Sequence, residues 1–262
     1  MDALAAIGCQ DDADIRLDEA ALHLAAADRT RADLAPTLEW LAELATQLPA
    51  TLPTARDRAE ALSNLLAKQE GFTGDHDEYD APRNADMLSV LARRRGLPVS
   101  LAILYVAIAR RAGWEARVMG LPGHVVVAIE GSEAVVLIDA FTDGRVLEPA
   151  ELAGLATSLA RGRPLRPGDS ALLNNRETLV RLLMNQASRA RQSGDDARAL
   201  TLYRRLTLIA PAMPALWWER ARLEREAGDT AAARRSLAAM RETTMDPELN
   251  DRIRQAYEAL TR

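Results

Sequence analysis

The hydrophobic pattern changes its period twice along the chain, from helix to strand and back to helix, and these changes limit the available folds more than any other feature. Apolar side chains at helical spacing predict three amphipathic helices within residues 16–70, and two more helices at 86–94 and 99–112. Valine-rich segments punctuated by glycine then predict strands at residues 115–120, 124–130, 134–141 and 145–147. A helix is expected over 149–160, and everything beyond residue 168 has a helical pattern. We therefore expect an α+β protein, with N-terminal helices and a small antiparallel sheet, followed by an all-α region.

A candidate linker divides the chain. Residues 161–168 contain two glycines and two prolines in eight positions, which is typical of a connection between domains. With 262 residues, the chain is long enough for one or two domains with a sizeable core. The sequence predicts a first domain at 1–165, with its core at about 70–160, and a second domain at 170–262.

Charge and cysteine content exclude several classes of function. The chain has 33 basic and 38 acidic residues and a net charge of −5, whereas a protein that binds nucleic acid without sequence preference needs a basic face. The most apolar stretch, residues 97–109, is too short to span a bilayer. The single cysteine, Cys9, rules out an internal disulfide and a zinc site built from cysteines. We expect no nucleic-acid partner, no membrane span and no cofactor.

The charged segments near the N-terminus and around His76 bear on location and on metal binding. The N-terminal residues are acidic and lack the basic start and long apolar run of a signal peptide, which indicates a cytoplasmic location. His76 lies among Asp75, Asp77 and Glu78, a set that could hold a divalent cation weakly. We interpret this segment instead as a solvated acidic loop, and no metal site is predicted.

The C-terminal region repeats itself with a period of 34 residues. Gly194-Asp195 recurs as Gly228-Asp229, and the small residue Ala199 recurs as Ala233. A helix pair of this length, with glycine at its turn, resembles the tetratricopeptide repeat. A plain helical bundle is the alternative. Two repeats followed by a final helix over 247–260 are expected.

The segment from Glu70 to Gly144 carries five short motifs. They read Glu70-Gly71-Phe72-Thr73-Gly74, Tyr79-Asp80-Ala81-Pro82-Arg83-Asn84, Arg95-Gly96-Leu97-Pro98-Val99-Ser100-Leu101, Leu121-Pro122-Gly123-His124 and Ile138-Asp139-Ala140-Phe141. In this order they resemble the SirB-type family of bacterial proteins, in which a transglutaminase-like core precedes tetratricopeptide repeats. The resemblance implies a papain-like α+β core. It also implies that Ser100 stands at the position of a catalytic cysteine, His124 at that of the histidine and Asp139 at that of the aspartate.

The residues themselves support a pairing of the histidine with the aspartate. Gly131-Ser132 suits a two-residue hairpin turn, which fixes a register with His124 directly opposite Asp139. Their Cβ atoms would then lie about 4.5 to 5.5 Å apart on one face of the sheet. An aspartate there would hold one imidazole nitrogen and leave the other free to act as a base. A register slip of one residue would place the two side chains on opposite faces.

Each of these residues also has a structural interpretation. Ser100 follows Pro98 at a helix start, where serine commonly caps the backbone amides, so a cap, a nucleophile and a ligand contact all remain open. A serine hydroxyl is a weaker nucleophile than a thiol and needs a well-placed base. His124 is either part of a site or a satisfied structural histidine. Asp139 is flanked by apolar residues, so it needs a partner, and His124 is the candidate.

Two further groups are candidate binding residues. Tyr79, Asp80, Arg83 and Asn84 form a polar cluster that could bind a substrate or peptide, although Asn84 could instead cap the helix that begins nearby. Trp218 follows a tryptophan that matches a buried repeat position, so it is expected to face outward and to mark a binding surface.

Two hypotheses of function follow from the sequence. The first is a cytoplasmic interaction or regulatory protein, with a catalytically altered transglutaminase-like core and a short repeat array that holds a protein or peptide partner. The second is a serine-dependent acyl transferase or amide hydrolase, in which Ser100 attacks, His124 moves protons and Asp139 orients the histidine. Geometry discriminates between them, because an enzyme needs the Ser100 hydroxyl within about 3.5 Å of a free His124 nitrogen in an open cleft.

Overall fold

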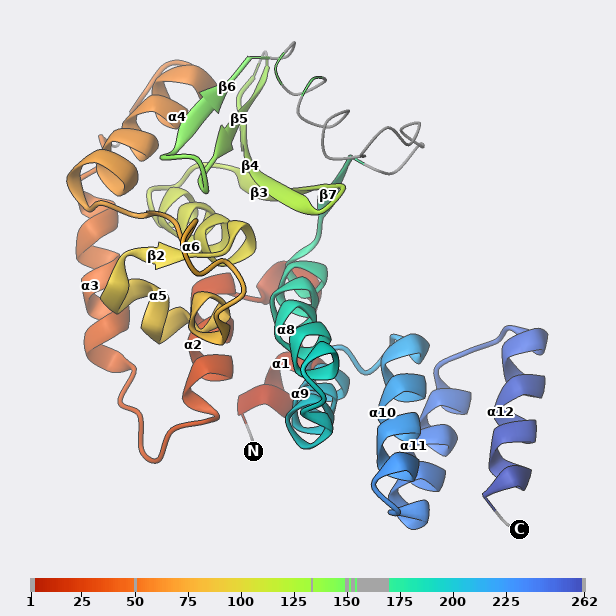
Figure 1. Cartoon of the computed structure of the whole chain (residues 1–262). Coiled ribbons are helices and arrows are strands. Elements are labelled where there is room, and N and C mark those ends of the chain that lie inside the picture. Colours follow the sequence, from red (N-terminus) through yellow and green to blue (C-terminus); the bar gives the residue numbers. More distant parts are fainter. Residues whose placement is uncertain are drawn as a thin grey trace. The chain divides into compact units, whose positions relative to one another are not determined.

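The structure of the protein is a computed structural model that describes residues 3–49, 51–132, 134–148, 151, 154 and 170–260. The first half contains α1 (Ala3–Cys9), α2 (Leu17–Ala26), α3 (Ala35–Thr46), α4 (Ala55–Ser63), β1 (Thr73–Gly74), α5 (Met87–Arg93), β2 (Arg95–Gly96) and α6 (Pro98–Arg111). The second half contains β3 (Ala116–Leu121), β4 (His124–Glu130), β5 (Val135–Asp139), β6 (Arg145–Leu147), β7 (Ala171–Leu173), α8 (Asn175–Gln192), α9 (Asp196–Ile209), α10 (Pro214–Glu226), α11 (Thr230–Glu242) and α12 (Pro247–Ala259). Figure 1 shows these elements coloured along the chain.

The chain divides into two compact units. The α/β unit runs from Asp12 to Leu182, and the helical unit combines the N-terminal segment up to Asp11 with the segment that begins at Leu183. The division falls inside α8, which contributes residues to both units. The expected helix at 149–160 and linker at 161–168 lie outside the described residues, except for Glu151 and Gly154, so the domain division predicted there stays a prediction.

The α/β unit contains the small antiparallel sheet that the sequence predicts. Its five strands lie in the order β6-β5-β4-β3-β7, and every neighbouring pair is antiparallel. The edge strand β7 contradicts the expectation that everything beyond residue 168 is helical. Three residues are too few to show a strand period, and β7 is fixed by its pairing with β3. A separate two-stranded parallel ladder joins β1 to β2.

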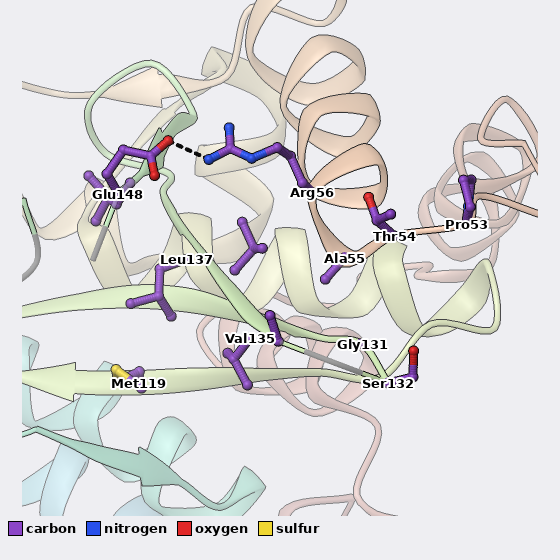
Figure 2. A pocket seen from close by; sticks show the side chains of 13 residues that line it. Pro53, Thr54, Ala55, Arg56, Met119, Gly131, Ser132, Val135, Leu137 and Glu148 are labelled. Atoms are coloured by element: carbon purple, nitrogen blue, oxygen red, sulfur yellow. Dashed lines mark hydrogen bonds and ion pairs between the residues drawn. The ribbon is translucent and has the colours of Figure 1, made fainter. Parts of the chain in front are cut away.

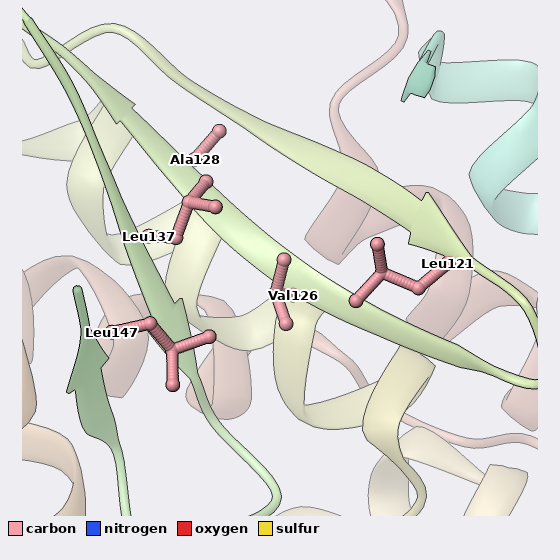
Figure 3. Packing of buried hydrophobic residues seen from close by; sticks show 5 residues of the cluster. All are labelled: Leu121, Val126, Ala128, Leu137 and Leu147. Atoms are coloured by element: carbon pink, nitrogen blue, oxygen red, sulfur yellow. The ribbon is translucent and has the colours of Figure 1, made fainter. Parts of the chain in front are cut away.

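Helix α6 forms the centre of the α/β unit. Every residue from Pro98 to Ala109 is buried, because the helix packs against β3 and β4 and is contacted by α2 and α3 as well (Figure 1). An apolar helix of this kind is stable only when it is covered on all sides. Side chains of the sheet form a further apolar cluster, shown in Figure 3: Leu121, Val126, Ala128, Leu137 and Leu147. The helices predicted for residues 16–112 are confirmed, with α4 continuing into a π-helical turn at Asn64–Gln69.

The β4–β5 hairpin differs from its predicted register. Val127 pairs with Ile138, and the loop is closed by a hydrogen bond from the Gly131 amide to the Ala134 carbonyl, 3.0 Å long. The loop is therefore two residues longer than the predicted Gly131-Ser132 turn, and the predicted direct pairing of His124 with Asp139 is wrong. A shift by two residues keeps side chains on the same face of a sheet. The two residues consequently remain diagonal neighbours.

The helical unit repeats one turn geometry at a spacing of 34 residues. Gly194 and Gly228 have positive φ angles of 76° and 81°, a backbone conformation that glycine adopts without strain. The next residues, Asp195 and Asp229, have matching φ and ψ angles of −85° and 72° and of −84° and 73°. Each aspartate side chain accepts a hydrogen bond from the amide three residues later and so caps α9 or α11.

The N-terminal helix α1 belongs to the same helical unit, although nothing in the sequence indicates this. Leu4 and Ile7 are buried as α1 packs on α9. Gly8 permits the approach, because a Cβ atom there would lie 2.0 Å from the Leu208 carbonyl oxygen. Among the described residues, no helix is both long and apolar enough to cross a membrane.

Candidate functional site

His124 and Asp139 are brought together as a side-chain pair. His124 begins β4 and Asp139 ends β5, and Nε2 of the imidazole lies 3.1 Å from Oδ1 of the carboxylate. The side chains are 10% and 7% exposed, respectively. A carboxylate can only accept hydrogen bonds, so the neutral ring donates from Nε2 and carries its lone pair on Nδ1. In the described part of the chain, no side chain or backbone group hydrogen-bonds to Nδ1.

The Asp139 carboxylate is held by its own turn as well as by the histidine. Oδ1 accepts hydrogen bonds from the amides of Phe141 and Thr142, 3.0 and 3.3 Å long, and Oδ2 accepts one from the Thr142 hydroxyl at 2.9 Å. Burial acts to raise the pKa of Asp139. The interaction with His124, with the bonds from Thr142, outweighs burial and holds the pKa below its usual value. The carboxylate is therefore an ionised, fixed acceptor that orients the imidazole.

Phe141 gathers three other rings around this pair. The centroid of its ring lies 6.3 Å from the ring centroid of His124, 5.6 Å from that of Tyr79 and 4.5 Å from that of His76. Each pair is in an edge-to-face arrangement. Gly74 lets the β1 segment approach, since a Cβ atom there would lie 2.6 Å from the Phe141 ring. The loop that follows β1 is thus packed against the His124–Asp139 corner, which we define as His124, Asp139, Phe141 and Thr142.

Ser100 lies in a different environment. It is the third residue of α6 and is fully buried, and its hydroxyl lies 2.7 Å from the Asn84 carbonyl oxygen and 3.0 Å from that of Leu97. The hydroxyl therefore donates to backbone carbonyls, and no amide in the described part of the chain donates to it, so the capping interpretation is wrong. Within the described residues, no hydrogen bond joins Ser100 to His124.

Asn84 also has a different role from a helix cap. Asp86 caps α5 by accepting from the Ser89 amide, whereas the buried Asn84 amide group donates to the Glu78 carbonyl at 2.6 Å. The Asn84 side-chain oxygen accepts from Arg93. The Asn84 side chain therefore links the loop after β1 to α5 through hydrogen bonds, and its backbone carbonyl accepts a hydrogen bond from the Ser100 hydroxyl.

Arg93 extends this network, because it donates hydrogen bonds to both Asn84 and Asp75. The guanidinium lies 2.8 Å from Oδ1 of Asn84 and 2.5 Å from Oδ2 of Asp75, which is buried. Burial acts to raise the pKa of Asp75. The hydrogen bond and charge of Arg93 act in the opposite direction and outweigh burial, so the pKa lies below its usual value. The sequence offers no signal for this network, because the contact joins residues 18 positions apart across a loop.

Three other predicted binding residues, Tyr79, Asp80 and Arg83, are exposed. Tyr79 is 38% exposed at the edge of the Phe141 cluster, Asp80 is also exposed, and the exposed Arg83 forms an ion pair with Glu78. Trp218, in the helical unit, is half-buried and lies beneath the Arg252 guanidinium, which is 5.0 Å from its ring. The structure thus brings Tyr79 to the His124–Asp139 corner, whereas Trp218 packs against α12. No cluster of three or more potential metal ligands occurs among the described residues.

A pocket of about 640 Å³ lies at the opposite end of the strands from His124. Figure 2 shows its lining, in which Met119, Leu137 and Val135 come from the sheet and Arg56 reaches Glu148 in an ion pair. The described lining includes none of the predicted site residues. The titratable His124–Asp139 pair lies at the other end of the sheet, and we base the functional argument on that pair.

A buried helix start beside a sheet that carries a histidine and an aspartate on neighbouring strands is consistent with a transglutaminase-like core. A family model described as the transglutaminase-like superfamily matches residues 32–184, more than half of the chain. The protein therefore belongs to the transglutaminase-like superfamily, as the sequence resemblance implies.

Curated relatives agree with this family. A UPF0162 protein of Xylella fastidiosa strain 9a5c is 32% identical over 183 residues, which are 68% of this chain and 64% of that protein. A second UPF0162 protein, from strain Temecula1, is 34% identical over 160 residues, or 59% of this chain and 56% of that protein. The human F-box only protein 21 is 29% identical over 145 residues, 52% of this chain and 22% of that protein. The chain thus spans less than two thirds of the length of each, and no solved structure matches it significantly.

Proposed function

We propose that this chain is a SirB-type interaction or regulatory protein, in which the transglutaminase-like core is catalytically altered and a repeat array holds a protein or peptide partner. The environment of Ser100 carries the proposal. Its hydroxyl is fully buried and donates to backbone carbonyls, so it is neither exposed to a substrate nor bonded to His124. A nucleophile needs both access and a base within hydrogen-bond reach.

The helical unit supports the repeat part of the proposal. Two helix pairs share a glycine turn and an aspartate cap at a spacing of 34 residues, with backbone angles that agree closely. Ala199 and Ala233, which match in the repeat, are both fully buried. These features favour tetratricopeptide repeats over a plain bundle. Short helical repeats present extended surfaces, which suit a protein or peptide better than a small molecule.

The enzyme alternative is favoured by the His124–Asp139 pair. Asp139 fixes Nε2 and leaves Nδ1 with the lone pair, which is how a general base is oriented. A serine-dependent acyl transferase or amide hydrolase would need Ser100 to turn toward Nδ1. That rotation would break the two hydrogen bonds that its hydroxyl makes with the Asn84 and Leu97 carbonyls.

A labelling experiment on Ser100 tests the proposal. The wild-type protein is incubated with a fluorophosphonate, and we expect no labelling, because the hydroxyl is buried and unactivated. In parallel, Ser100→Cys is prepared in a Cys9→Ala background and treated with iodoacetamide at neutral pH. We expect its thiol to react more slowly than the exposed Cys9 of the wild type.

For each of the two labelling experiments, one result would contradict the proposal. Fluorophosphonate labelling that disappears in Ser100→Ala would replace the proposal with the enzyme alternative. If the thiol introduced by Ser100→Cys reacts faster than Cys9, this position is accessible and activated, and the proposal loses its main support. The cytoplasmic location expected from the sequence, and the expected absence of a nucleic-acid or membrane partner, remain predictions.

A further inference from the structure

The hairpin turn that presents His124 has an unfavourable geometry. Strands β3 and β4 are joined by Pro122 and Gly123, and Leu121 and His124 form the last pair of the ladder. Proline fixes φ near −65°, which excludes the two turn types that suit a two-residue hairpin, since both need a positive φ at that position. Gly123 has a φ of 70°, so the pattern fits a type II turn. Turns of that type tend to splay the flanking strands.

One side chain spans this turn from outside the hairpin. Arg181 of α8 donates from Nη2 to the carbonyl oxygens of Leu121 and His124, at 3.2 and 2.8 Å. The guanidinium passes beside Gly120, 3.5 Å from the position that a Cβ atom would take there. Burial lowers the pKa of Arg181, and the nearby Tyr79 opposes this shift. A half-buried guanidinium is costly to desolvate unless its donors are used, and here Nη2 joins the two ends of the hairpin.

We infer that Arg181 is a positioning residue for His124: by holding both carbonyls at the ends of the Pro122-Gly123 turn, it fixes where the imidazole meets Asp139. A splayed turn would move the first residue of β4, and a hydrogen bond of 3.1 Å would not survive a displacement of about 1 Å. This inference goes beyond the proposed function, because it concerns the orientation of His124 whether the site binds or catalyses.

The ring proton of His124 reports on this positioning directly. The chain has three histidines, so the His124 Nε2–H resonance in a ¹⁵N-labelled protein is assigned by its loss in His124→Gln. We expect a hydrogen-bonded ring proton in the wild type that exchanges slowly with water. Arg181→Met keeps an unbranched side chain but removes the hydrogen-bond donors of the guanidinium. Exchange in this variant should be at least several-fold faster, or the resonance should broaden beyond detection.

Two further variants separate positioning from general destabilisation. Arg191→Met makes the same substitution on the same helix, where the guanidinium pairs with Asp196 and Glu226, and should leave the His124 proton unchanged. Arg181→Lys keeps one charged donor without the planar guanidinium, and its exchange rate should lie between those of the wild type and Arg181→Met. Thermal unfolding of each variant measures its stability independently.

Wild-type exchange in a folded Arg181→Met protein would overturn the inference. If that variant does not fold, wild-type exchange in Arg181→Lys would overturn it equally. Faster exchange in Arg191→Met by the same factor would also do so, because the effect would then not be specific to the hairpin. The labelling experiment tests Ser100, whereas proton exchange tests the position of His124, and neither result depends on the other. Failure of the proposed function and failure of this inference are therefore distinguishable.

Discussion

The N-terminus of α6 and the His124–Asp139 corner both bury polar side chains, but they satisfy them differently. The Ser100 hydroxyl donates to two backbone carbonyls, each of which also receives a backbone amide: Asn84 from Leu97, and Leu97 from Leu101. Asp139 instead accepts from another side chain, His124, whose second nitrogen has no hydrogen bond within the described residues. A side chain bonded only to backbone serves the fold, whereas a titratable pair with one unused nitrogen retains chemical capacity.

Removing the carboxylate of Asp139 should have the largest effect on this contrast. Asp139→Ala leaves the His124 ring and the amides of Phe141 and Thr142 without their acceptor. We expect the free energy of unfolding to fall by about 1 to 3 kcal/mol, the cost of unsatisfied buried polar groups. Urea denaturation followed by circular dichroism measures it. Asp139→Asn keeps an acceptor and should lose less; equal unfolding midpoints for wild type and Asp139→Ala would mean that the pair contributes nothing to stability.

Acid should weaken both this corner and the Asp75–Arg93 contact in a predictable direction. The pKa values of Asp139 and Asp75 are lowered in the folded state, so their contribution is fully present above the unfolded value of about 3.9. It is lost as the pH falls through the lower folded pKa, where the native carboxylates become protonated. Stability should therefore fall below about pH 4. In a series of melts, the difference between wild type and Asp139→Asn should shrink over that range; a constant difference would contradict the assignment.

The hydroxyl of Ser100 should matter less than the carboxylate of Asp139. In Ser100→Ala, each carbonyl keeps its backbone donor, so no buried acceptor is left unsatisfied. We expect a loss of about 0.5 to 1.5 kcal/mol, typical of one hydrogen bond. Chemical denaturation of the two variants side by side tests the ranking. If Ser100→Ala is the more destabilised, the hydroxyl contributes more than its contacts indicate, and the comparison of the two corners fails.

The smallest effect is expected at Thr142. Its hydroxyl donates to Oδ2 of Asp139 from an exposed position, while the other three donors bind Oδ1. Thr142→Val removes this single bond at nearly constant volume, and the cost should be about 0.5 to 1 kcal/mol. A thermal melt measures the change, and Thr142→Ser, which keeps the hydroxyl, is the matched control. A loss as large as that of Asp139→Ala would identify Thr142, and not His124, as the main partner of the carboxylate.

The parts of the candidate site that depend on local strand geometry were predictable from the sequence. The parts that depend on contacts between distant segments were not. The alternation of strands β4 and β5 put His124 and Asp139 on one face, and that placement survived a hairpin loop two residues longer than predicted. The role of Ser100 was not predictable, because the Asn84 carbonyl that it meets lies 16 residues earlier in the sequence. Arg181 carried no signal, since only the tertiary fold brings α8 to the β3–β4 turn.

The sequence by itself determined the helices, the strands of β3 to β6 and the repeated turns at Gly194 and Gly228, because periodicity, capping and positive φ angles are local properties. It also carried the motifs that place the chain in the transglutaminase-like superfamily. Tertiary structure alone decided the three-residue strand β7, the docking of α1 on α9 and the fate of each buried polar group. The physical reason is that burial leaves a hydroxyl or carboxylate no water to bond with, so its partner is whichever group the packed chain places within reach.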